Sequence, residues 1–271
     1  MPTLSTEAIR RLRRKILGYY KAHGRDLPFR RTTDPYKIAV AEIMLQQTQV
    51  DRVVPKYLAW VRKWPDWNSL AIATNRELLT MWSGLGYNRR AIFLGRMAKE
   101  IVDDYGGKLP QDLTELRALP GIGPYTSRAI LIFAFNLPLV TIDTNIRRVL
   151  IAELNLPHSI SSTELESIAL QVLPKGRSRD WHNALMDYGA THMTARKSGV
   201  KPLSHQSKFE GSLRQIRGEI IRQLTTQRRV SLANVAKKLG RTIEDVKKAA
   251  MGLEKEGVVR VGLKFVSLIC K

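Results

Sequence analysis

The sequence predicts a mostly α-helical protein that ends in a small segment of helices and strands. From about residue 6 to 190, apolar residues recur at the 3.6-residue period of helices, and short turns rich in Pro, Gly and Asn separate the helical stretches. Residues 191–211 lack this periodicity and are rich in Ser, Gly and Lys, which is typical of an irregular linker. The pattern changes again in residues 212–271, so we expect one large helical domain at 1–190 and a second domain at 212–271.

The chain is basic along its whole length. Its 271 residues contain 45 Lys and Arg against 24 Asp and Glu, a formal net charge of +21. This charge favours a polyanionic partner, and nucleic acid is the first choice. An anionic membrane surface is the competing choice, but no apolar stretch is long enough to span a bilayer and no lipidation motif is present.

The N-terminal residues 1–24 predict an amphipathic helix and not a signal peptide. Leu12, Ile16 and Tyr20 fall on one side of that helix, and the segment lacks the apolar core and cleavage site of a secretory signal. We therefore expect a cytoplasmic protein. The single cysteine, Cys270, excludes a disulfide within the chain and any cysteine-ligated cluster or zinc site built from this chain alone.

An apolar helix carries one carboxylate, Glu42, in the stretch IAVAEIML. Burial in such a helix raises the pKa of a carboxyl group and keeps its proton available. The plain alternative is an ion pair with a nearby arginine. Gln46 and Gln49, at i+4 and i+7, would share the face of Glu42, and a stripe of carboxylate and amides suits a surface that contacts bases.

A hairpin between two helices is predicted in LRALPGIGPYTSRAIL, residues 116–131. Its two glycines allow a tight turn, and the second helix opens at Pro124, so amide groups face outwards at a helix N-terminus. Such a turn binds phosphate without regard to base sequence. A purely structural turn is the alternative. The residues expected at the phosphate are Leu119, Gly121, Ile122, Gly123, Tyr125 and Thr126.

A second carboxylate, Asp143, ends the apolar run that precedes DTNIRRVL. By itself this pattern indicates an ordinary helix N-cap. A buried carboxylate is nevertheless costly unless something pairs with it or uses it. Asn145, Arg147, Arg148 and the helix start should keep Asp143 ionised.

The C-terminal residues predict three helices, at 212–227, 231–240 and 242–257, followed by two short strands around Gly262. This layout is that of a winged helix-turn-helix. The same layout also serves contacts between proteins, and that alternative stays open. The basic residues expected to contact DNA are Lys237, Lys238, Lys247, Lys248 and Arg260.

Several of these motifs together resemble a known family. The hairpin, the Asp in VTIDTN, and the stretches AEIMLQQTQV and MWSGLGYNRRAIFL are similar to those of the MutY-type adenine DNA glycosylases of the helix-hairpin-helix superfamily, over about residues 8–190. The resemblance implies a two-lobed helical glycosylase fold that acts on double-stranded DNA with a mismatched or damaged base. It also implies a monomer at the nucleoid.

The resemblance implies roles for the site residues. Glu42 would protonate the leaving base, and Asp143, with Asn145 beside it, would stabilise the oxocarbenium-like sugar or act as nucleophile, the division of labour that two carboxylates of different pKa allow. The base pocket and intercalating residues would be Arg30, Gln46 and Tyr87. Bifunctional relatives have a lysine where this chain has Tyr125, and a phenol forms no imine, so a monofunctional enzyme is expected.

The sequence departs from the family at two places. Typical members bind an iron-sulfur cluster through four cysteines, whose positions are occupied here by the apolar residues Met193, Val200, Leu203 and Phe209. We expect no cofactor, and a small hydrophobic plug in place of the cluster. Members that act opposite 8-oxoguanine usually have a Nudix-like C-terminal domain, whereas here the basic segment follows.

Three functions remain after the sequence is considered. The first is excision of adenine opposite 8-oxoguanine or guanine in base excision repair. The second is excision of mismatched thymine, uracil or another modified base on the same scaffold. The third is a DNA-binding regulator without enzyme activity. Glu42 favours adenine, because a purine leaving group needs an acid at its ring nitrogen.

Overall fold

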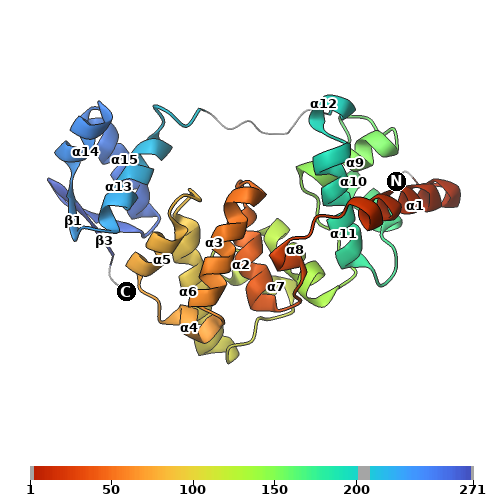
Figure 1. The fold of residues 1–271 in the computed structure, drawn as a ribbon, viewed down its shortest axis with the longest axis horizontal. Coiled ribbons are helices and arrows are strands. Elements are labelled where there is room, and N and C mark those ends of the chain that lie inside the picture. The colour runs from red at the N-terminus through yellow and green to blue at the C-terminus, as the bar shows by residue number, and fades with distance from the viewer. Residues whose placement is uncertain (1–2, 201–207, 270–271) are drawn as a thin grey trace. The chain divides into compact units, whose positions relative to one another are not determined.

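The computed structural model describes residues 3–200 and 208–269 (Figure 1). Over these residues the chain is helical apart from one small sheet, as predicted. It divides into two compact units. Unit 1 comprises Met1–Ala39, Gln111–Arg117 and Ile122–His205, and unit 2 comprises Val40–Pro110, Ala118–Gly121 and Gln206–Lys271. The predicted domain boundaries at 190 and 211 stay a prediction.

Two helices, α2 (Pro35–Leu45) and α7 (Leu113–Ala118), cross from one unit into the other. The other helices of unit 1 are α1 (Thr6–His23), α8 (Pro124–Phe135), α9 (Thr144–Glu153), α10 (Ser162–Val172), α11 (Ser178–Asp187) and α12 (Ala195–Ser198), with a 3₁₀ turn at Pro28–Arg30 and a π turn at Tyr188–His192. The first helices of unit 2 are α3 (Val50–Lys63), α4 (Trp67–Ala71), α5 (Asn75–Trp82) and α6 (Arg89–Tyr105). None of the described helices is long and apolar enough to cross a membrane.

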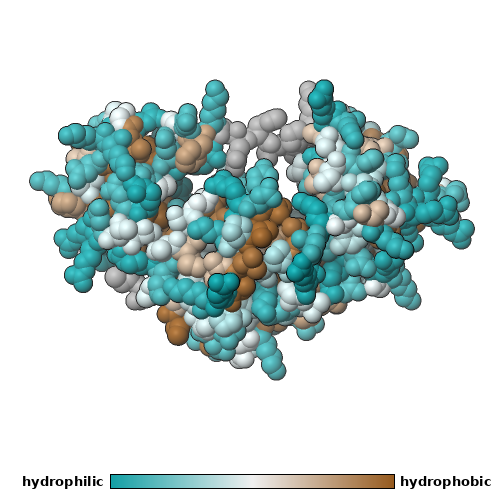
Figure 2. Space-filling model, viewed as in Figure 1, coloured by the Kyte–Doolittle hydropathy of each residue, from teal (hydrophilic) through white to brown (hydrophobic). Residues whose placement is uncertain are grey.

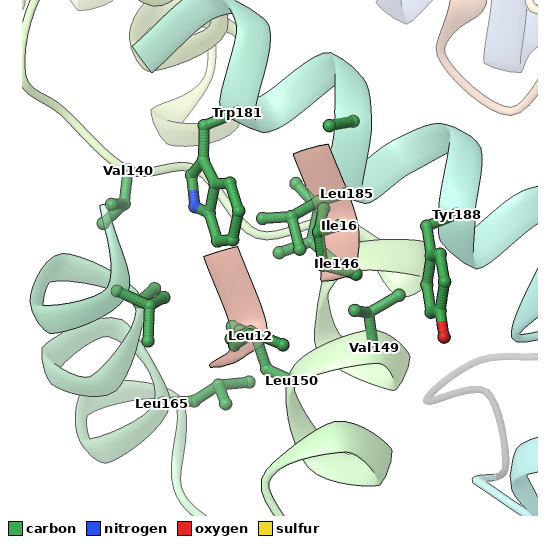
Figure 3. Close-up of a cluster of buried hydrophobic side chains, with 13 residues drawn as sticks. Leu12, Ile16, Val140, Ile146, Val149, Leu150, Leu165, Trp181, Leu185 and Tyr188 are labelled. Atoms are coloured by element: carbon green, nitrogen blue, oxygen red, sulfur yellow. The ribbon is translucent and has the colours of Figure 1, made fainter. Parts of the chain in front are cut away.

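The core of unit 1 holds α9 in place. Ile146 and Leu150 of α9 pack with Trp181 and Leu185 of α11 and with Leu12 of α1 (Figure 3). Each such side chain stabilises the fold by about 1.5–3 kcal/mol when it is fully buried. Because α9 begins directly after Asp143, this core fixes the position of that carboxylate.

A second cluster in unit 1 surrounds α8. Ala129, Ile132 and Phe133 of this helix pack with Ile38, and Tyr125 lies partly buried against them. Eight of the 12 residues of α8 are buried, in agreement with its apolar sequence. The predicted start of this helix at Pro124 is confirmed.

The C-terminal segment forms α13 (Leu213–Leu224), β1 (Arg229–Ser231), α14 (Leu232–Leu239), α15 (Ile243–Lys255), β2 (Val259–Val261) and β3 (Phe265–Leu268). The three predicted helices and the strands on either side of Gly262 are confirmed. The strand β1 was not predicted, because three residues are too few to show an alternating pattern. The antiparallel sheet has the order β1-β3-β2.

Side chains of α5 and α6 hold this segment through its backbone. Arg76 donates to the carbonyl oxygens of Leu224 and Gln227. Asn75 donates to Ile269 O at 2.7 Å, and Arg96 donates to Gly257 O at 2.9 Å. The C-terminal segment is therefore part of the compact body of unit 2.

The hydrophobic plug expected in place of the cluster is wrong for at least one of its residues. Met193 is partly buried against the core of unit 1, and Val200 is buried. Phe209, in contrast, is 57% exposed and belongs to unit 2, so it does not join them. Leu203 lies outside the described residues. A short helix, α12, occupies part of the expected linker, and Gly199 is its C-cap.

Candidate active site

Asp143 is the N-cap of α9, as its sequence predicted. Its Oδ1 accepts a hydrogen bond from the amide of Ile146 at 2.7 Å, and its Oδ2 accepts one from Asn145 Nδ2 at 3.0 Å. The carboxylate is thus held at both oxygens by groups within three residues. We call residues 141–145 the Asp143 turn.

Arg148 holds the Asn145 amide in turn. Its Nη1 donates to Asn145 Oδ1 at 3.2 Å and to the carbonyl oxygen of Gly189 at 2.9 Å. A Cβ at Gly189 would stand 2.8 Å from Asn145 Cβ, so only glycine allows this close approach. A chain of hydrogen bonds therefore runs from the backbone of the π turn, through Arg148 and Asn145, to Asp143.

The ionisation of Asp143 reflects two opposing effects. Burial raises the pKa of its carboxyl group, and the hydrogen bonds from Ile146 and Asn145 and the charge of Arg148 lower it. The net pKa lies above the ordinary value. The hydrogen bonds and the arginine charge therefore lower the pKa of Asp143 without cancelling the effect of burial, and the expectation that Asp143 stays ionised remains a prediction.

A buried histidine anchors the chain before Asp143. His182 Nε2 accepts from the amide of Thr141 at 3.2 Å, and its Nδ1 is 2.7 Å from Ser178 O. Since Nε2 accepts, Nδ1 carries the proton and donates to that carbonyl. Burial lowers the pKa of His182 to about 4, so the ring is neutral. It ties the Asp143 turn to α11.

The hairpin between α7 and α8 has the geometry that its glycines predicted. Gly121 has φ +83°, a conformation that residues with a side chain rarely adopt, and a Cβ there would stand in tight contact, 3.0 Å from Phe93 Cβ. Gly123 is the N-cap of α8, and Pro124 begins the helix. Helix N-termini of this form bind phosphate through their amides.

The side chains of the hairpin have structural tasks. Leu119, Ile122 and Thr126 are buried, so only their backbones are open to a phosphate. Tyr125 is half-buried, and its carbonyl oxygen accepts from Thr141 Oγ1 at 3.4 Å. The hairpin and the Asp143 turn are thereby joined within unit 1.

Glu42 lies on α2, half-buried, in the part of that helix that belongs to unit 2. The prediction that Gln46 and Gln49 continue its helical face is wrong, because α2 ends at Leu45. Gln47 has the left-handed φ of 54°, and Gln49 is the N-cap of α3. Gln46 therefore lies in a turn between two helices.

One buried guanidinium, that of Arg90, organises this turn. It donates at 2.7 Å to the carbonyl oxygens of Ile43 in α2 and of Gln46 in the turn that follows. It also donates to those of Leu85 and Gly86, at 3.2 and 3.0 Å. We call Arg90 and its acceptors the Arg90 cluster; the acceptors are Ile43, Met44, Gln46, Thr48, Leu85 and Gly86. Burial lowers the pKa of Arg90 to about 10, so it stays charged at neutral pH.

Tyr87 stands at the edge of the Arg90 cluster. It has φ +47°, a strained value for a residue with a side chain, and it is 36% exposed. The Arg90 guanidinium lies 5.7 Å from its ring centre, within the range of a cation–π contact. Gln46 and Tyr87, both predicted to contact DNA, therefore both contact Arg90. Gln46 does so through its backbone carbonyl and Tyr87 through its ring.

Arg30 has a protein partner. Both of its Nη atoms donate to the carboxylate of Asp187, at 2.7 and 2.8 Å, and Arg25 Nε donates to it at 2.7 Å. Burial favours the neutral form of Asp187, but these arginines outweigh it, and its pKa lies below the ordinary value. The base-pocket role of Arg30 stays a prediction.

The residues near the expected cluster position do not fit an iron-sulfur cluster. Met193 and Val200 supply no thiolate, and Cys270 lies outside the described residues. Within residues 3–200 and 208–269, no three His, Cys, Asp or Glu side chains come together as a metal site would require.

The predicted C-terminal contacts differ in their surroundings. Lys238 is paired with Glu219, at 2.9 Å. The other four residues, Lys237, Lys247, Lys248 and Arg260, are exposed.

Arg90, His182 and Asp187 are the residues that sequence reasoning missed. Arg90 is the second residue of α6, His182 lies within α11, and Asp187 is the last residue of α11. Each acts on a segment more than 40 residues away or, for Asp187, more than 150. Buried charged residues are rare unless paired, but the sequence alone does not show which charges are buried.

The chain matches the family described as HhH-GPD superfamily base excision DNA repair protein, over residues 40–175. Among curated proteins, the adenine DNA glycosylase of Mycolicibacterium smegmatis is 36% identical over 228 residues, which are 76% of this chain and 78% of that protein. The human adenine DNA glycosylase is 35% identical over 74% of this chain, and the match spans 39% of the human protein.

Solved structures of DNA repair enzymes also resemble this chain. A thermostable thymine-DNA glycosylase matches with a TM-score of 0.65 and 29% identity, over 71% of this chain and 90% of that one. A trapped endonuclease III–DNA covalent intermediate matches with a TM-score of 0.62 over 75% of this chain and 92% of that one, and at 21% identity it shows the fold alone. The chain therefore belongs to the HhH-GPD superfamily of base excision DNA repair proteins.

Proposed function

We propose that the chain is a monofunctional DNA glycosylase that removes adenine mispaired with 8-oxoguanine or guanine. The observation that carries the proposal is the Asp143 turn, in which both carboxylate oxygens are aimed by hydrogen bonds from Ile146 and Asn145. Identity of 35–36% to adenine DNA glycosylases supports the choice of base.

The proposed reaction breaks the bond between the base and C1′ of the sugar. The bonding electrons leave with the adenine, and Glu42 gives the base a proton. Asp143 stabilises the positive charge that develops on the sugar, or bonds to it. One water molecule adds to C1′ and supplies the proton that restores Glu42. Free adenine and an abasic site are the products.

We infer that the enzyme leaves the DNA strand intact. Strand cleavage through a Schiff base needs an amine, and Tyr125 in the first turn of α8 offers a phenol. Tyr125 would instead position the sugar or the Asp143 turn. Its carbonyl oxygen accepts a hydrogen bond from Thr141 of that turn at 3.4 Å.

We also infer that residues 212–271 form a winged helix-turn-helix. The order α13, β1, α14, α15, β2, β3, with a three-stranded antiparallel sheet, supports this. The protein would act as a monomer on double-stranded DNA.

Excision of mismatched thymine or uracil is the second candidate. The likeness to a thermostable thymine-DNA glycosylase, at 29% identity, favours it. The Glu42 acid on α2 favours adenine, because departure of a purine gains more from protonation.

One experiment separates these functions. The purified protein is incubated with duplexes that contain A:8-oxoG, A:G, T:G or U:G, and abasic sites are revealed with alkali. Strand breaks in the adenine duplexes only after alkali support the proposal. Cleavage of T:G or U:G alone would establish the second candidate, breaks without alkali would contradict the monofunctional assignment, and tight sequence-selective binding with no excision would indicate a regulator.

A further inference from the structure

The outer face of the C-terminal sheet carries an uncommon row of side chains. Arg229 of β1 and Arg260 of β2 both lie opposite Ser267 of β3 in the strand register. Residues directly opposite one another share a face of the sheet. Because adjacent strands are about 4.8 Å apart, the backbones of the two arginines stand about 10 Å apart with the serine hydroxyl between them.

An aromatic side chain extends this row. Phe265 is two residues before Ser267 on β3, so it lies on the same face, and it is 48% exposed. The opposite face of the sheet is apolar, since Val230, Val259 and Val266 are buried. We call Arg229, Arg260, Phe265 and Ser267 the C-terminal sheet face.

The two arginines of this face are not neutralised. In the described parts of the chain, 3–200 and 208–269, neither Arg229 nor Arg260 forms an ion pair, although both are exposed. Some other basic residues of the segment are neutralised, since Arg217 pairs with Glu256, and Lys238 and Arg222 pair with Glu219. Lys247 and Lys248 of α15 form no ion pair among the described residues either, so the difference between the two surfaces lies in the carboxylates of α15.

Helix α15 does not offer the same charge. Its 13 residues contain three acids, Glu244, Asp245 and Glu254, and three lysines, Lys247, Lys248 and Lys255, so its formal charges cancel. In a helix-turn-helix the corresponding helix normally enters the major groove. A helix with as many carboxylates as lysines is poorly suited to lie between two rows of phosphates.

We propose that the C-terminal sheet face, and not α15, is where this segment binds DNA. Arg229 and Arg260 would each contact a phosphate, Ser267 would donate to a phosphate oxygen, and Phe265 would pack on a sugar or base. The occupant is the duplex that carries the substrate base, so the inference deepens the proposed function. The hydrogen bonds from Arg76, Asn75 and Arg96 hold the face rigidly on unit 2, so binding there costs little ordering entropy.

Equal charge removal at two surfaces tests this. R229A/R260A and K247A/K248A each remove two positive charges, and K99A/K108A does so elsewhere on unit 2. Binding to a fully paired duplex of about 30 bp is measured by fluorescence anisotropy between about 50 and 200 mM KCl. We expect R229A/R260A to weaken binding about tenfold and to reduce the slope of log Kd against log salt by about 2, because each phosphate contact accounts for about one unit.

The two other double variants should change the affinity less than threefold. A loss for K247A/K248A as large as that for R229A/R260A would overturn the proposal, and so would a loss for R229A/R260A no larger than that for K99A/K108A. R229K/R260K keeps the charge and is expected to restore the salt slope. If it fails to do so, the loss reflects a damaged sheet and the proposal falls.

The fully paired duplex contains no substrate base, so this test does not depend on catalysis. If the wild-type protein excises no base from any duplex but R229A/R260A still loses affinity, the glycosylase proposal fails and the binding surface stands. If excision occurs and R229A/R260A binds as the wild-type protein does, the proposed binding surface fails and the glycosylase proposal stands.

Discussion

The Asp143 turn and the Arg90 cluster both hold predicted site residues, but they do so over different distances in the sequence. The groups that bond Asp143 directly, from Asn145 and Ile146, lie within three residues of it. Arg90 instead holds carbonyls of α2 and of the turn after it, which lie 44 to 47 residues earlier in the chain. The helix that Asp143 begins therefore positions its carboxylate, whereas the turn of Gln46 depends on a side chain from a distant part of the sequence, that of Arg90.

The two regions also differ in how electrostatics enters. In the Asp143 turn, burial raises the pKa of the carboxyl group, and neighbours moderate that rise. In the Arg90 cluster, the buried charge is a cation with neutral carbonyl acceptors, and its pKa falls to about 10. Removing charge should therefore damage chemistry in the first region and stability in the second.

The largest effect is expected for D143N. Asparagine keeps an acceptor for the amide of Ile146 but loses the one for Asn145 Nδ2. It also buries no charge, so these effects oppose each other and the melting temperature should change little. The negative charge beside the sugar is lost, and the single-turnover excision rate should fall by about 10³-fold or more. Quench-flow excision assays and calorimetry measure the two quantities. A large drop in melting temperature would contradict a primarily chemical role.

The next effect, on stability, is expected for R90M. The carbonyls of Ile43, Gln46 and Gly86 lose their donor in a buried site, which should lower the free energy of unfolding by about 3 kcal/mol and the melting temperature by about 6–12 °C. R89M is the matched control, because Arg89 is exposed and its ion pair with Glu256 is long, at 3.7 Å. Equal melting temperatures for the two variants would show that the cluster does not stabilise unit 2.

A pH effect of similar size should arise from His182. Its pKa is about 4 in the folded chain against 6.5 ordinarily, so between these values the unfolded chain binds the extra proton. Stability from His182 is complete above pH 6.5 and is lost as the pH falls toward 4, by about 3 kcal/mol in total.

Urea unfolding at pH 7 and pH 4.5 measures this loss. In H182Q the loss attributable to this residue should disappear. H158Q is the control, since His158 is exposed and should leave the pH dependence as it is in the wild-type protein. An unchanged pH dependence in H182Q would contradict the assignment.

The smallest effect is expected for R148M. Asn145 would lose the donor at 3.2 Å that orients it toward Asp143, and the excision rate should fall about tenfold, which corresponds to about 1.4 kcal/mol. R147M serves as control, because Arg147 donates to His158 O on the surface. A rate unchanged by R148M would show that Asn145 needs no support from the π turn.

The positions of individual elements were largely predictable. The N-cap at Asp143, the start of α8 at Pro124 and the tight turn at Gly121 follow from residue types within a few positions of one another. Hydrophilic residues cover most of the visible face of the C-terminal segment (Figure 2). Phe209 shows the limit of such reasoning, because an apolar residue is not always buried.

By itself, the sequence determined the helical class, the hairpin, the capped carboxylate and the resemblance to glycosylases, because each depends on local spacing and residue type. Only the tertiary structure decided that α2 ends before Gln46, that Arg30 binds Asp187, and that Arg229 and Arg260 flank one serine. These contacts join segments far apart in the chain. Hydrophobic periodicity says which face of an element is buried, but it does not say which distant carbonyl, carboxylate or strand will lie against it.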